Sequence, residues 1–349
     1  MTQNLTVLCL GAARSDRFAQ TLDAALRDHP HQTVDHLAEP LQNARLLFAV
    51  LLEEGGVNHA FYSLLAFLRT HPGCLSGSVG GVLVDGPGDL YTKAVGRELV
   101  LAANMAGCAF PGRPLVEGTG DLRNFTVQAK NAGCSLEGAY RLAAADLAQR
   151  VLDFSSLRRS RPNLLVLHAS NRSTSNTLAL WSRCRERLEP RCAVTEIGLR
   201  NGTLEDCAGC PYTMCLHYGE KGGCFYGGVM VQEVYPAIRE ADAVVLLCPN
   251  YNDALSANLT AAINRLTALY RTTPFTGKAV FAIVVSGYSG GDIVASQVVS
   301  ALNMNKGFWL PPEFCLLETA NDAGTAMALP GIKGRLDKFT ENILRQLSV

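Results

Sequence analysis

The sequence predicts an α/β protein with two doubly wound parallel sheets in tandem, each a three-layer α/β/α domain. Short apolar runs of strand length alternate with longer amphipathic stretches, as in parallel sheets whose strands are joined by helices. The alternation starts again after a polar, basic stretch that ends in proline, SSLRRSRP. We therefore expect a first domain at 1–154, a linker at 155–162 and a second domain at 163–349.

The composition supports packed domains and disfavours several classes of partner. Of the 349 residues, 48% are hydrophobic and 18% are charged, and Lys+Arg and Asp+Glu balance at 31 each. A zero net charge disfavours nucleic acid or an anionic membrane as the main partner, and no apolar run reaches the ~18 residues of a membrane span. No basic residue precedes the first apolar run, so we expect no secretory signal, a cytoplasmic location and reduced cysteines.

The individual elements follow from the same alternation, taken in chain order. In the first half we expect strands at 5–10, 34–37, 46–52, 79–84 and 114–116, and helices at 18–26, 60–69, 91–105 and 136–152. In the second half we expect strands at 164–168, 193–197, 243–248, 280–286 and 314–317, and helices at 177–187, 230–239, 257–270, 293–303 and 332–347. The run 46–52 is apolar throughout, which is typical of a strand buried on both faces.

The two halves align with each other, which suggests a tandem duplication. Residues 46–70 align with 244–272, and residues 79–89 align with 278–292. The alternative is that any two α/β domains show such alternation. If the halves are copies, the first has lost most hydroxyls of its first turn and carries Glu53 and Glu54 where an anionic cofactor would be repelled. We therefore expect the first domain to be a degenerate copy without cofactor.

A turn rich in hydroxyl residues follows the first strand of the second half, in NLLVLHASNRSTSNT (163–177). The turn runs into a helix, whose free N–H groups bind anions. Side chains that can add donors or positive charge are Ser170, Arg172, Ser173, Ser175 and Thr177. The pattern predicts a phosphate site, and the alternative is a cluster that only caps the helix.

Two further loops leave the carboxyl ends of predicted strands, where open α/β sheets bind ligands. The sequence PNYND (249–253) offers backbone amides and an aromatic ring, and SGYSGG (286–291) lets backbone approach a flat ring. The candidate residues in these loops are Pro249, Asn250, Tyr251, Asn252, Ser286, Gly287, Tyr288, Gly290 and Gly291. The three loops together predict one cofactor site.

These motifs resemble those of the flavodoxin-like NAD(P)H-dependent FMN reductases over about 163–349. Asn176 completes the first motif, and Ser256, Ala257 and Leu259 follow the second, whereas Thr260 and Asn264 replace the usual Lys and Asp. The resemblance implies a flavodoxin-like fold, FMN bound by the residues of the three loops, and NAD(P)H as the reductant. The flavin carries the hydride chemistry in such enzymes, so no acid–base residue is assigned.

Four cysteines lie close together in a segment that the first half lacks, the insert 206–228. Cys207, Cys210, Cys215 and Cys224 have the spacing Cys-x2-Cys-x4-Cys-x8-Cys. Four thiolates can hold a 4Fe-4S cluster, and the segment resembles that of iron–sulfur flavoproteins, whose motif is usually tighter. The alternatives are structural zinc, with His217 as an alternate ligand, and a metal-free lid.

The function predicted is an NAD(P)H-dependent FMN oxidoreductase that reduces a small acceptor such as a quinone or flavin. The first alternative is an electron carrier that relays electrons between partner proteins through FMN and a cluster. The second is a flavin-binding or redox-sensing module. Members of the family commonly associate so that a neighbour's loops cover the flavin. We expect the first domain to stand in for that neighbour in an intrachain pseudodimer, with further homo-oligomerisation left open.

Overall fold

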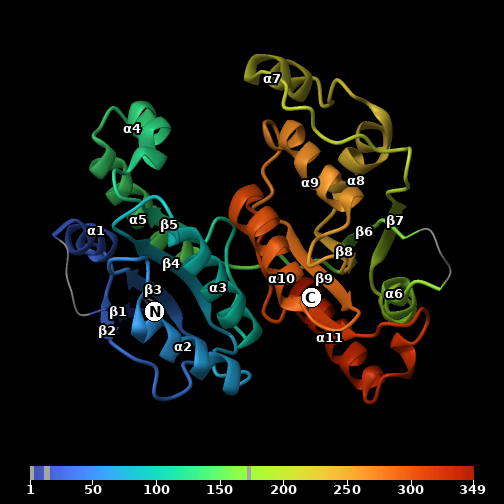
Figure 1. Cartoon of the computed structure of the whole chain (residues 1–349), viewed down its shortest axis with the longest axis horizontal. Helices are drawn as coiled ribbons and strands as arrows, with labels where there is room; N and C mark the ends of the chain where they lie inside the picture. The colour runs from blue at the N-terminus through green and yellow to red at the C-terminus, as the bar shows by residue number, and fades with distance from the viewer. Residues whose placement is uncertain (1–3, 12–15, 171–173) are drawn as a thin grey trace. The chain divides into compact units, whose positions relative to one another are not determined.

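The computed structural model describes residues 4–11, 16–170 and 174–349 and divides the chain into two compact units, Met1–Ser155 and Ser156–Val349. Each unit contains one five-stranded sheet in which all strands are parallel, with helices on both faces (Figure 1). The strand order is β2-β1-β3-β4-β5 in the first unit and β10-β9-β8-β6-β7 in the second. Both orders are the flavodoxin-like arrangement, so the predicted fold class is confirmed.

The sheet of the first unit is built around a buried apolar strand. Its strands are β1 (Leu5–Leu10), β2 (His31–Val34), β3 (Arg45–Leu51), β4 (Val79–Asp85) and β5 (Leu115–Gly118). All residues of β4 and all but Arg45 of β3 are buried, as expected for central parallel strands covered on both faces. The second strand lies at 31–34, not at the predicted 34–37, because this edge strand is polar and exposed, whereas the apolar Leu37 is buried outside it.

Helices cover the two faces of this first sheet. They are α1 (Asp16–Leu26), α2 (His59–Thr70), α3 (Thr92–Met105), α4 (Thr126–Ala132) and α5 (Leu136–Asp153), with a 3₁₀ turn at Arg123–Phe125. The helix α1 packs on α5, which lies over β3, β4 and β5, and α2 packs on α3, which lies over β4 and β5. From the centre of the sheet, strands are added first toward one edge and then toward the other, and every crossover between parallel strands is right-handed. The pair α1–α5 and the pair α2–α3 therefore lie on opposite faces of the sheet.

The second unit repeats this plan with added helices between its second and third strands. Its strands are β6 (Asn163–His168), β7 (Ala193–Gly198), β8 (Ala243–Pro249), β9 (Ala279–Ser286) and β10 (Cys315–Thr319). Its helices are α6 (Asn176–Leu188), α7 (Tyr212–Glu220), α8 (Tyr235–Glu240), α9 (Ala257–Tyr270), α10 (Gly291–Val298) and α11 (Ile332–Leu347), with π-helical turns at Met230–Val234 and Val299–Lys306 and a 3₁₀ turn at Ala326–Ala328. The additional elements are α7, which lies in the cysteine segment and packs against α9, and α8 with the π-helical turn before it.

The structure differs from the sequence prediction mainly at short helices. The helices α4 and α7 were not predicted, since each is shorter than the three turns over which an amphipathic pattern becomes clear. The helix predicted at 293–303 changes from α to π geometry at Val299. Of the helices that the structure describes, none combines the length and the apolar character needed to cross a membrane. The common strand order is what a tandem duplication predicts, and the duplication itself stays a prediction.

Candidate functional site

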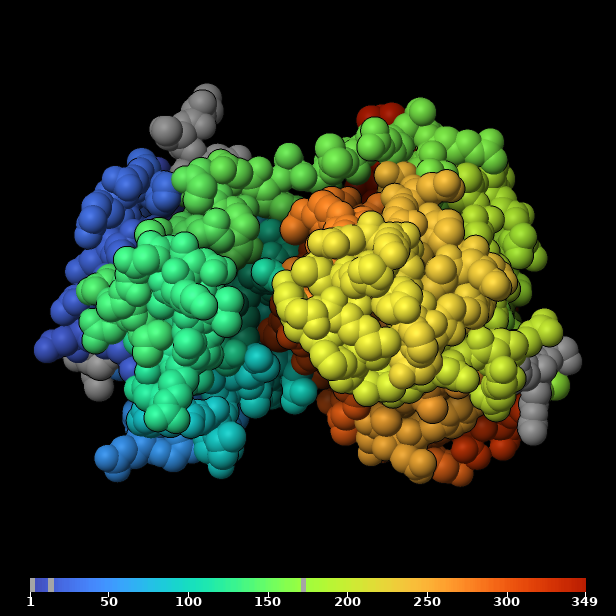
Figure 2. Space-filling model, turned by 90° about the horizontal axis from the view of Figure 1, so that it is seen from above, coloured from blue at the N-terminus to red at the C-terminus, as the bar shows by residue number. Residues whose placement is uncertain are grey.

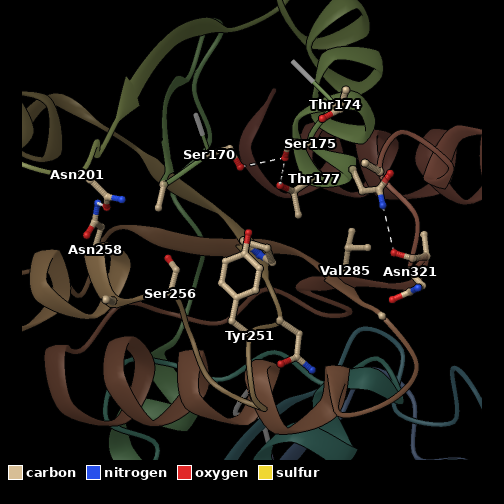
Figure 3. A pocket seen from close by; sticks show the side chains of 18 residues that line it. Ser170, Thr174, Ser175, Thr177, Asn201, Tyr251, Ser256, Asn258, Val285 and Asn321 are labelled. Atoms are coloured by element: carbon tan, nitrogen blue, oxygen red, sulfur yellow. Dashed lines mark hydrogen bonds between the residues drawn. The ribbon is translucent and has the colours of Figure 1, made fainter. Parts of the chain in front are cut away.

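A cavity of about 690 Å³ lies at the carboxyl ends of the strands of the second sheet (Figure 3). The loops after β6, β7, β8, β9 and β10 all contribute to it. The described residues that line it are Ala169, Ser170, Thr174, Ser175, Asn176, Thr177, Asn201, Pro249, Asn250, Tyr251, Ser256, Ala257, Asn258, Val285, Gly287, Ala320, Asn321 and Ala323. The structure therefore brings the three predicted loops to one site.

The first loop presents a chain of hydroxyl groups to this cavity. Ser170 Oγ lies 2.9 Å from Ser175 Oγ, which lies 3.0 Å from Thr177 Oγ1 (Figure 3). Ser175 is also the N-cap of α6, where its Oγ accepts a hydrogen bond from Leu178 N at 3.4 Å. The capping role and a phosphate-binding role are thus compatible, because a capped helix still has other free N–H groups at its start. The predicted residues Arg172 and Ser173 lie outside the described residues.

Asn176 connects the start of α6 to the loop after β10. Its Nδ2 donates to Ala320 O at 3.1 Å and Asp322 O at 2.9 Å, and its Oδ1 accepts from Ala326 N at 3.0 Å. The predicted site did not include this β10 loop, which forms one wall of the cavity. Its position could have been predicted, because β10 ends at the same edge of the sheet as the other strands.

The second and third loops are joined by the side chain of Asn250. Its Nδ2 donates to Ser286 Oγ at 3.1 Å, to Asp253 Oδ1 at 3.1 Å and to Ser289 O at 3.0 Å. Gly290 has a φ of 81°, and a Cβ at this position would collide with the Asp253 carboxylate. Glycine is therefore required here for the two loops to meet.

Several predicted residues build these loops and are not among the described lining residues. Ser286 is buried and accepts from Asn250, Asn252 has a left-handed φ of 56°, and Gly290 and Gly291 form the start of α10. Tyr288 is 81% exposed. Tyr251, which is 62% exposed, stands in the cavity opposite the hydroxyl chain (Figure 3).

Two buried polar atoms at the cavity have no hydrogen-bond partner among the described residues. They are Asn250 Oδ1 and Ser256 Oγ, and Ser256 as a whole is 7% exposed. Leaving a buried polar atom unpaired costs about 1–3 kcal/mol, so such atoms indicate a place where a ligand completes the hydrogen bonding. Sequence reasoning gave Ser256 no role in the site and missed Asn201 and Asn258, whose side chains hydrogen-bond each other at 3.0 Å.

The residues at this cavity have little acid–base capacity of their own. Tyr251 is the single titratable side chain among the described residues that line it. The described lining residues therefore offer no pair of side chains for acid–base catalysis.

Residues 162–322 match the NADPH-dependent FMN reductase family. The match covers most of the second unit and confirms, for these residues, the resemblance predicted from the three loops. It supports the predicted enzyme class, a flavin oxidoreductase. A search of curated protein sequences finds no relative of this chain.

Several solved structures have a similar fold. An NADH:FMN oxidoreductase in its apo form is 14% identical and covers 54% of this chain and 90% of its own, with a TM-score of 0.37. An FMN-dependent NADH-azoreductase from Bacillus anthracis, in complex with FMN, is 14% identical and covers 53% of this chain and 98% of its own, with a TM-score of 0.36. A flavoenzyme NAD(P)H:(acceptor) oxidoreductase from Paracoccus denitrificans is 17% identical, with coverages of 53% and 98% and a TM-score of 0.33. Likeness at this level carries no argument about activity.

His168 ends β6 immediately before the turn that leads into α6. It is buried, its Nδ1 has no partner among the described residues, and its Nε2 lies 3.5 Å from Glu196 Oε1. Burial lowers the pKa of His168, and attraction to Glu196 opposes that shift without cancelling it. The imidazole is therefore neutral at neutral pH and does not add positive charge to this turn.

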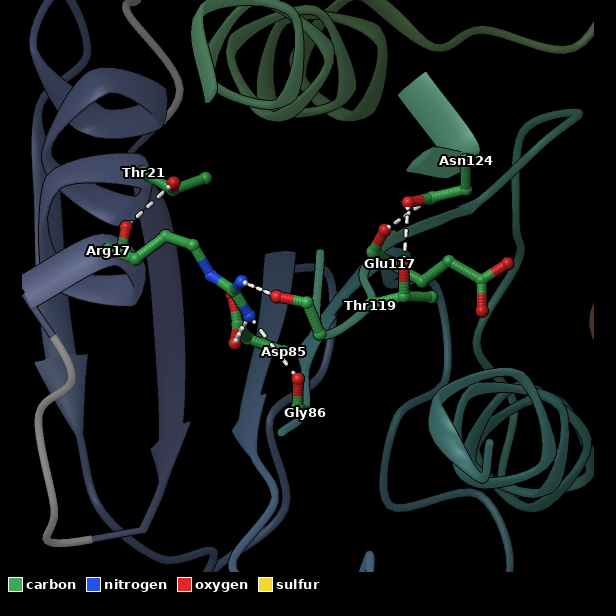
Figure 4. Close-up of polar contacts among 8 residues, drawn as sticks. Arg17, Thr21, Asp85, Gly86, Glu117, Thr119 and Asn124 are labelled. Carbon is green, nitrogen blue, oxygen red and sulfur yellow. Dashed lines mark hydrogen bonds and ion pairs between the residues drawn. The ribbon is translucent and has the colours of Figure 1, made fainter. Parts of the chain in front are cut away.

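The corresponding edge of the first unit holds an internal ion pair (Figure 4). The Arg17 guanidinium contacts the Asp85 carboxylate through Nη2–Oδ1 at 2.5 Å and Nε–Oδ2 at 3.1 Å. It also donates to Gly86 O at 3.2 Å and Gly120 O at 2.9 Å. Burial alone would lower the pKa of Arg17. The hydrogen bond and the electrostatic attraction to Asp85 outweigh burial, so the pKa is raised. Glu53 and Glu54 are exposed in the neighbouring loop.

The four cysteines of the second unit line one smaller cavity of about 170 Å³. The cysteine segment lies on the surface of this unit (Figure 2). Cys207 is exposed, the other three are partly buried, and Tyr218, Phe225 and Tyr226 provide apolar walls. Among the residues that the structure describes, no three His, Cys, Asp or Glu side chains are arranged to hold a single metal ion. The cysteines therefore share a cavity without converging on one point.

Proposed function

We propose that the second unit binds FMN in the cavity of about 690 Å³ and uses NAD(P)H to reduce a small acceptor such as a quinone or a flavin. The family match supports both the cofactor and the reductant. The observation that carries the proposal is the arrangement of the cavity. Hydroxyl groups and a helix N-terminus lie at one end, and unpaired buried polar atoms lie in its wall.

The cavity fits FMN in size and chemistry. Its volume lies within the range of about 300–1,000 Å³ that is usual for small-molecule sites. The end formed by Ser170, Ser175 and Thr177 suits a phosphate, because hydroxyls and helix N–H groups are donors. Asn250 Oδ1 and Ser256 Oγ suit the polar edge of a flavin ring, and Gly287 allows close approach of that ring to the backbone.

Bound FMN would supply the hydride chemistry, and the protein would supply binding and orientation. In this proposal Ser170, Ser175 and Thr177 fix the phosphate, while Asn250 and Ser256 fix the ring edge. Tyr251 stands at the exposed side of the cavity, where the reductant and the acceptor would approach in turn. Asn252, Ser286, Tyr288, Gly290 and Gly291, which were predicted to bind the cofactor, are proposed here to shape the loops around it, since they are not among the described lining residues.

A charge reversal tests the phosphate assignment. We expect Arg172→Glu to weaken FMN binding, because it replaces the predicted cation beside the phosphate with an anion. Arg183→Glu is the matched control, since Arg183 lies on α6, outside the residues that line the cavity, with its side chain 43% exposed and paired with Glu186. Flavin content of the purified proteins and the FMN Kd by fluorescence titration measure the effect. Equal occupancy in both variants would contradict the assignment.

The number of FMN molecules bound per chain tests whether the first unit takes a cofactor. We expect one FMN per chain, and two would contradict the proposal that the first unit takes no cofactor. Size-exclusion chromatography of the same sample tests the predicted pseudodimer, for which a monomeric chain holding one FMN is the expected result. The cytoplasmic location stays a prediction.

The cysteine cavity favours one second candidate, an electron carrier that uses FMN together with an iron–sulfur cluster. All four cysteines line a single cavity of about 170 Å³ with apolar walls, which suits a group of several atoms. A single zinc ion needs four sulfurs at about 2.3 Å from one point. The described residues offer no such arrangement, so the cluster is proposed from the cavity that the four cysteines share.

Absorption spectra and iron analysis of anaerobically purified protein separate these candidates. Iron with broad absorbance beneath the flavin bands would support the carrier, and a metal-free flavin spectrum would support the reductase with a cysteine lid. Rapid bleaching of the flavin by NAD(P)H alone would count against the third alternative, a flavin-binding or redox-sensing module.

A further inference from the structure

Arg265 is a buried cation without a carboxylate partner among the described residues. It lies on α9, is 2% exposed, and forms no ion pair with any acidic side chain in the described part of the chain. Its Nη2 donates to Gly227 O at 2.7 Å and its Nη1 to Glu205 O at 3.5 Å, and its buried Nε has no partner there. A buried guanidinium that meets only neutral acceptors is costly, so an anion is expected next to it.

The surroundings of Arg265 show where that anion would lie. Arg265 lines the same cavity of about 170 Å³ as Cys207, Cys210, Cys215 and Cys224. The two carbonyls that it binds flank the cysteine segment, one just before Cys207 and one just after Cys224. The guanidinium thus binds the chain near both ends of the segment, and Arg265 lines the cavity that the four cysteines share.

We propose that Arg265 is the counter-charge of a thiolate-bound metal cluster in this cavity. The inference rests on the carrier function proposed above. Four thiolates give such a centre a net negative charge, which a buried cation stabilises strongly in a medium of low dielectric. One added electron makes the centre more negative, so the cation favours the reduced state and raises the reduction potential. Arg265 is therefore a positioning and tuning residue and is not itself a ligand.

Charge and hydrogen bonding can be separated with three variants. Arg265→Gln keeps a donor but removes the charge, and Arg265→Lys keeps the charge. Arg271→Gln is the matched control, because Arg271 lines the same cavity but is exposed and lies over the Tyr212 ring at 4.5 Å. Each protein is reconstituted anaerobically with ferrous iron and sulfide. Iron per chain, the rate of iron loss to a chelator and the cluster potential are then measured.

We expect Arg265→Gln to lose iron about 10- to 100-fold faster than the parent and to have a more negative potential, as for other residues that support metal ligands. Arg265→Lys should lose iron at nearly the parent rate and should have nearly the parent potential. Arg271→Gln should match the parent in both quantities. FMN content and circular dichroism show whether each variant has folded. If Arg265→Gln does not fold, Arg265→Lys still tests the proposal. Because the proposal attributes the potential to the positive charge, Arg265→Lys should have nearly the parent potential.

The possible failures are distinguishable. A parent chain that takes up no iron would overturn the cluster and this inference together, while leaving the FMN reductase proposal intact. A parent that binds a cluster whose stability and potential do not change in Arg265→Gln would overturn the role of Arg265 alone. Equal losses in Arg265→Gln and Arg265→Lys would show that Arg265 only ties the segment ends together.

Discussion

The carboxyl edges of the two sheets share one strand order but use their polar groups differently. In the second unit, loops from five strands surround a cavity of about 690 Å³, and Asn250 Oδ1 and Ser256 Oγ are unpaired within the described residues. In the first unit, Arg17 reaches to the same edge and binds Asp85 and two backbone carbonyls. The same fold therefore leaves polar loop groups unpaired at a cavity in one unit and uses polar groups in an internal ion pair in the other.

The ion pair of the first unit also bears on the proposal that this unit takes no cofactor. Arg17 satisfies Asp85, whose side chain is 3% exposed, within the protein itself. A ligand that binds Arg17 or Asp85 would have to replace these contacts, although the buried Tyr140 hydroxyl near Asp85 has no hydrogen-bond partner among the described residues. A ligand in the second unit could add hydrogen bonds at Asn250 and Ser256, whereas a ligand at the Arg17–Asp85 pair would first have to break existing ones.

The largest expected effect comes from breaking the internal pair of the first unit. Arg17→Met should destabilise this unit by about 3–5 kcal/mol, because it leaves the Asp85 carboxylate buried and unpaired. Both tryptophans, Trp181 and Trp309, lie in the second unit. Urea unfolding followed by circular dichroism should therefore show an earlier transition, while tryptophan fluorescence should not. Arg141→Met, at an exposed pair with Glu137, is the control with a small expected loss.

An intermediate effect is expected where the second and third loops meet. Gly290→Ala should weaken FMN binding about tenfold, because the left-handed backbone is strained by a Cβ and Asp253 must move away from Asn250. Gly55→Ala in the first unit has the same φ strain, at 82°, but no atom lies within 4 Å of the added Cβ. Its FMN Kd should equal that of the parent. Similar Kd values for both variants would remove the loop junction from the site.

A smaller effect is expected at Ser256, where one substitution should stabilise the protein without FMN but weaken the binding of FMN. Without FMN, Ser256→Ala should raise stability by about 1 kcal/mol, because it removes an unpaired buried hydroxyl. With FMN, the same change should weaken binding about fivefold, the value of one lost hydrogen bond. Thermal unfolding with and without FMN measures both. A variant that is less stable in both states would show that the hydroxyl has a partner within the protein.

The smallest effect concerns pH. Burial lowers the pKa of His168, so between that value and about 6.5 the unfolded chain binds a proton that the folded chain does not. Stability should therefore fall as the pH falls through this window and should be complete above it. His168→Gln should flatten the dependence. Urea midpoints between pH 5 and 8 provide the measurement, and an unchanged slope would exclude His168 as its cause.

The fold and the three loops could be predicted from the sequence, because the spacing of apolar residues and the residue types of a loop can be read from short stretches of chain. The sequence was insufficient where a side chain acts across a large separation in sequence. Asn176 binds the loop after β10, and Arg17 binds Asp85, through contacts that no local pattern records. Similarly, the cysteine spacing identified a cluster of thiols, but the buried position of Arg265 beside them depends on how α9 packs against the segment.

The hydrogen bonds of Asn176 have a consequence for where the second unit can be cut. The family match ends at residue 322, but Asn176 accepts from Ala326 N, and α11 packs on the same helix α6 that Asn176 begins. A fragment trimmed to the matching residues would leave the start of α6 without its anchor and one face of α6 exposed. The minimal flavin-binding fragment therefore has to extend to the end of α11, well beyond the boundary that family similarity suggests.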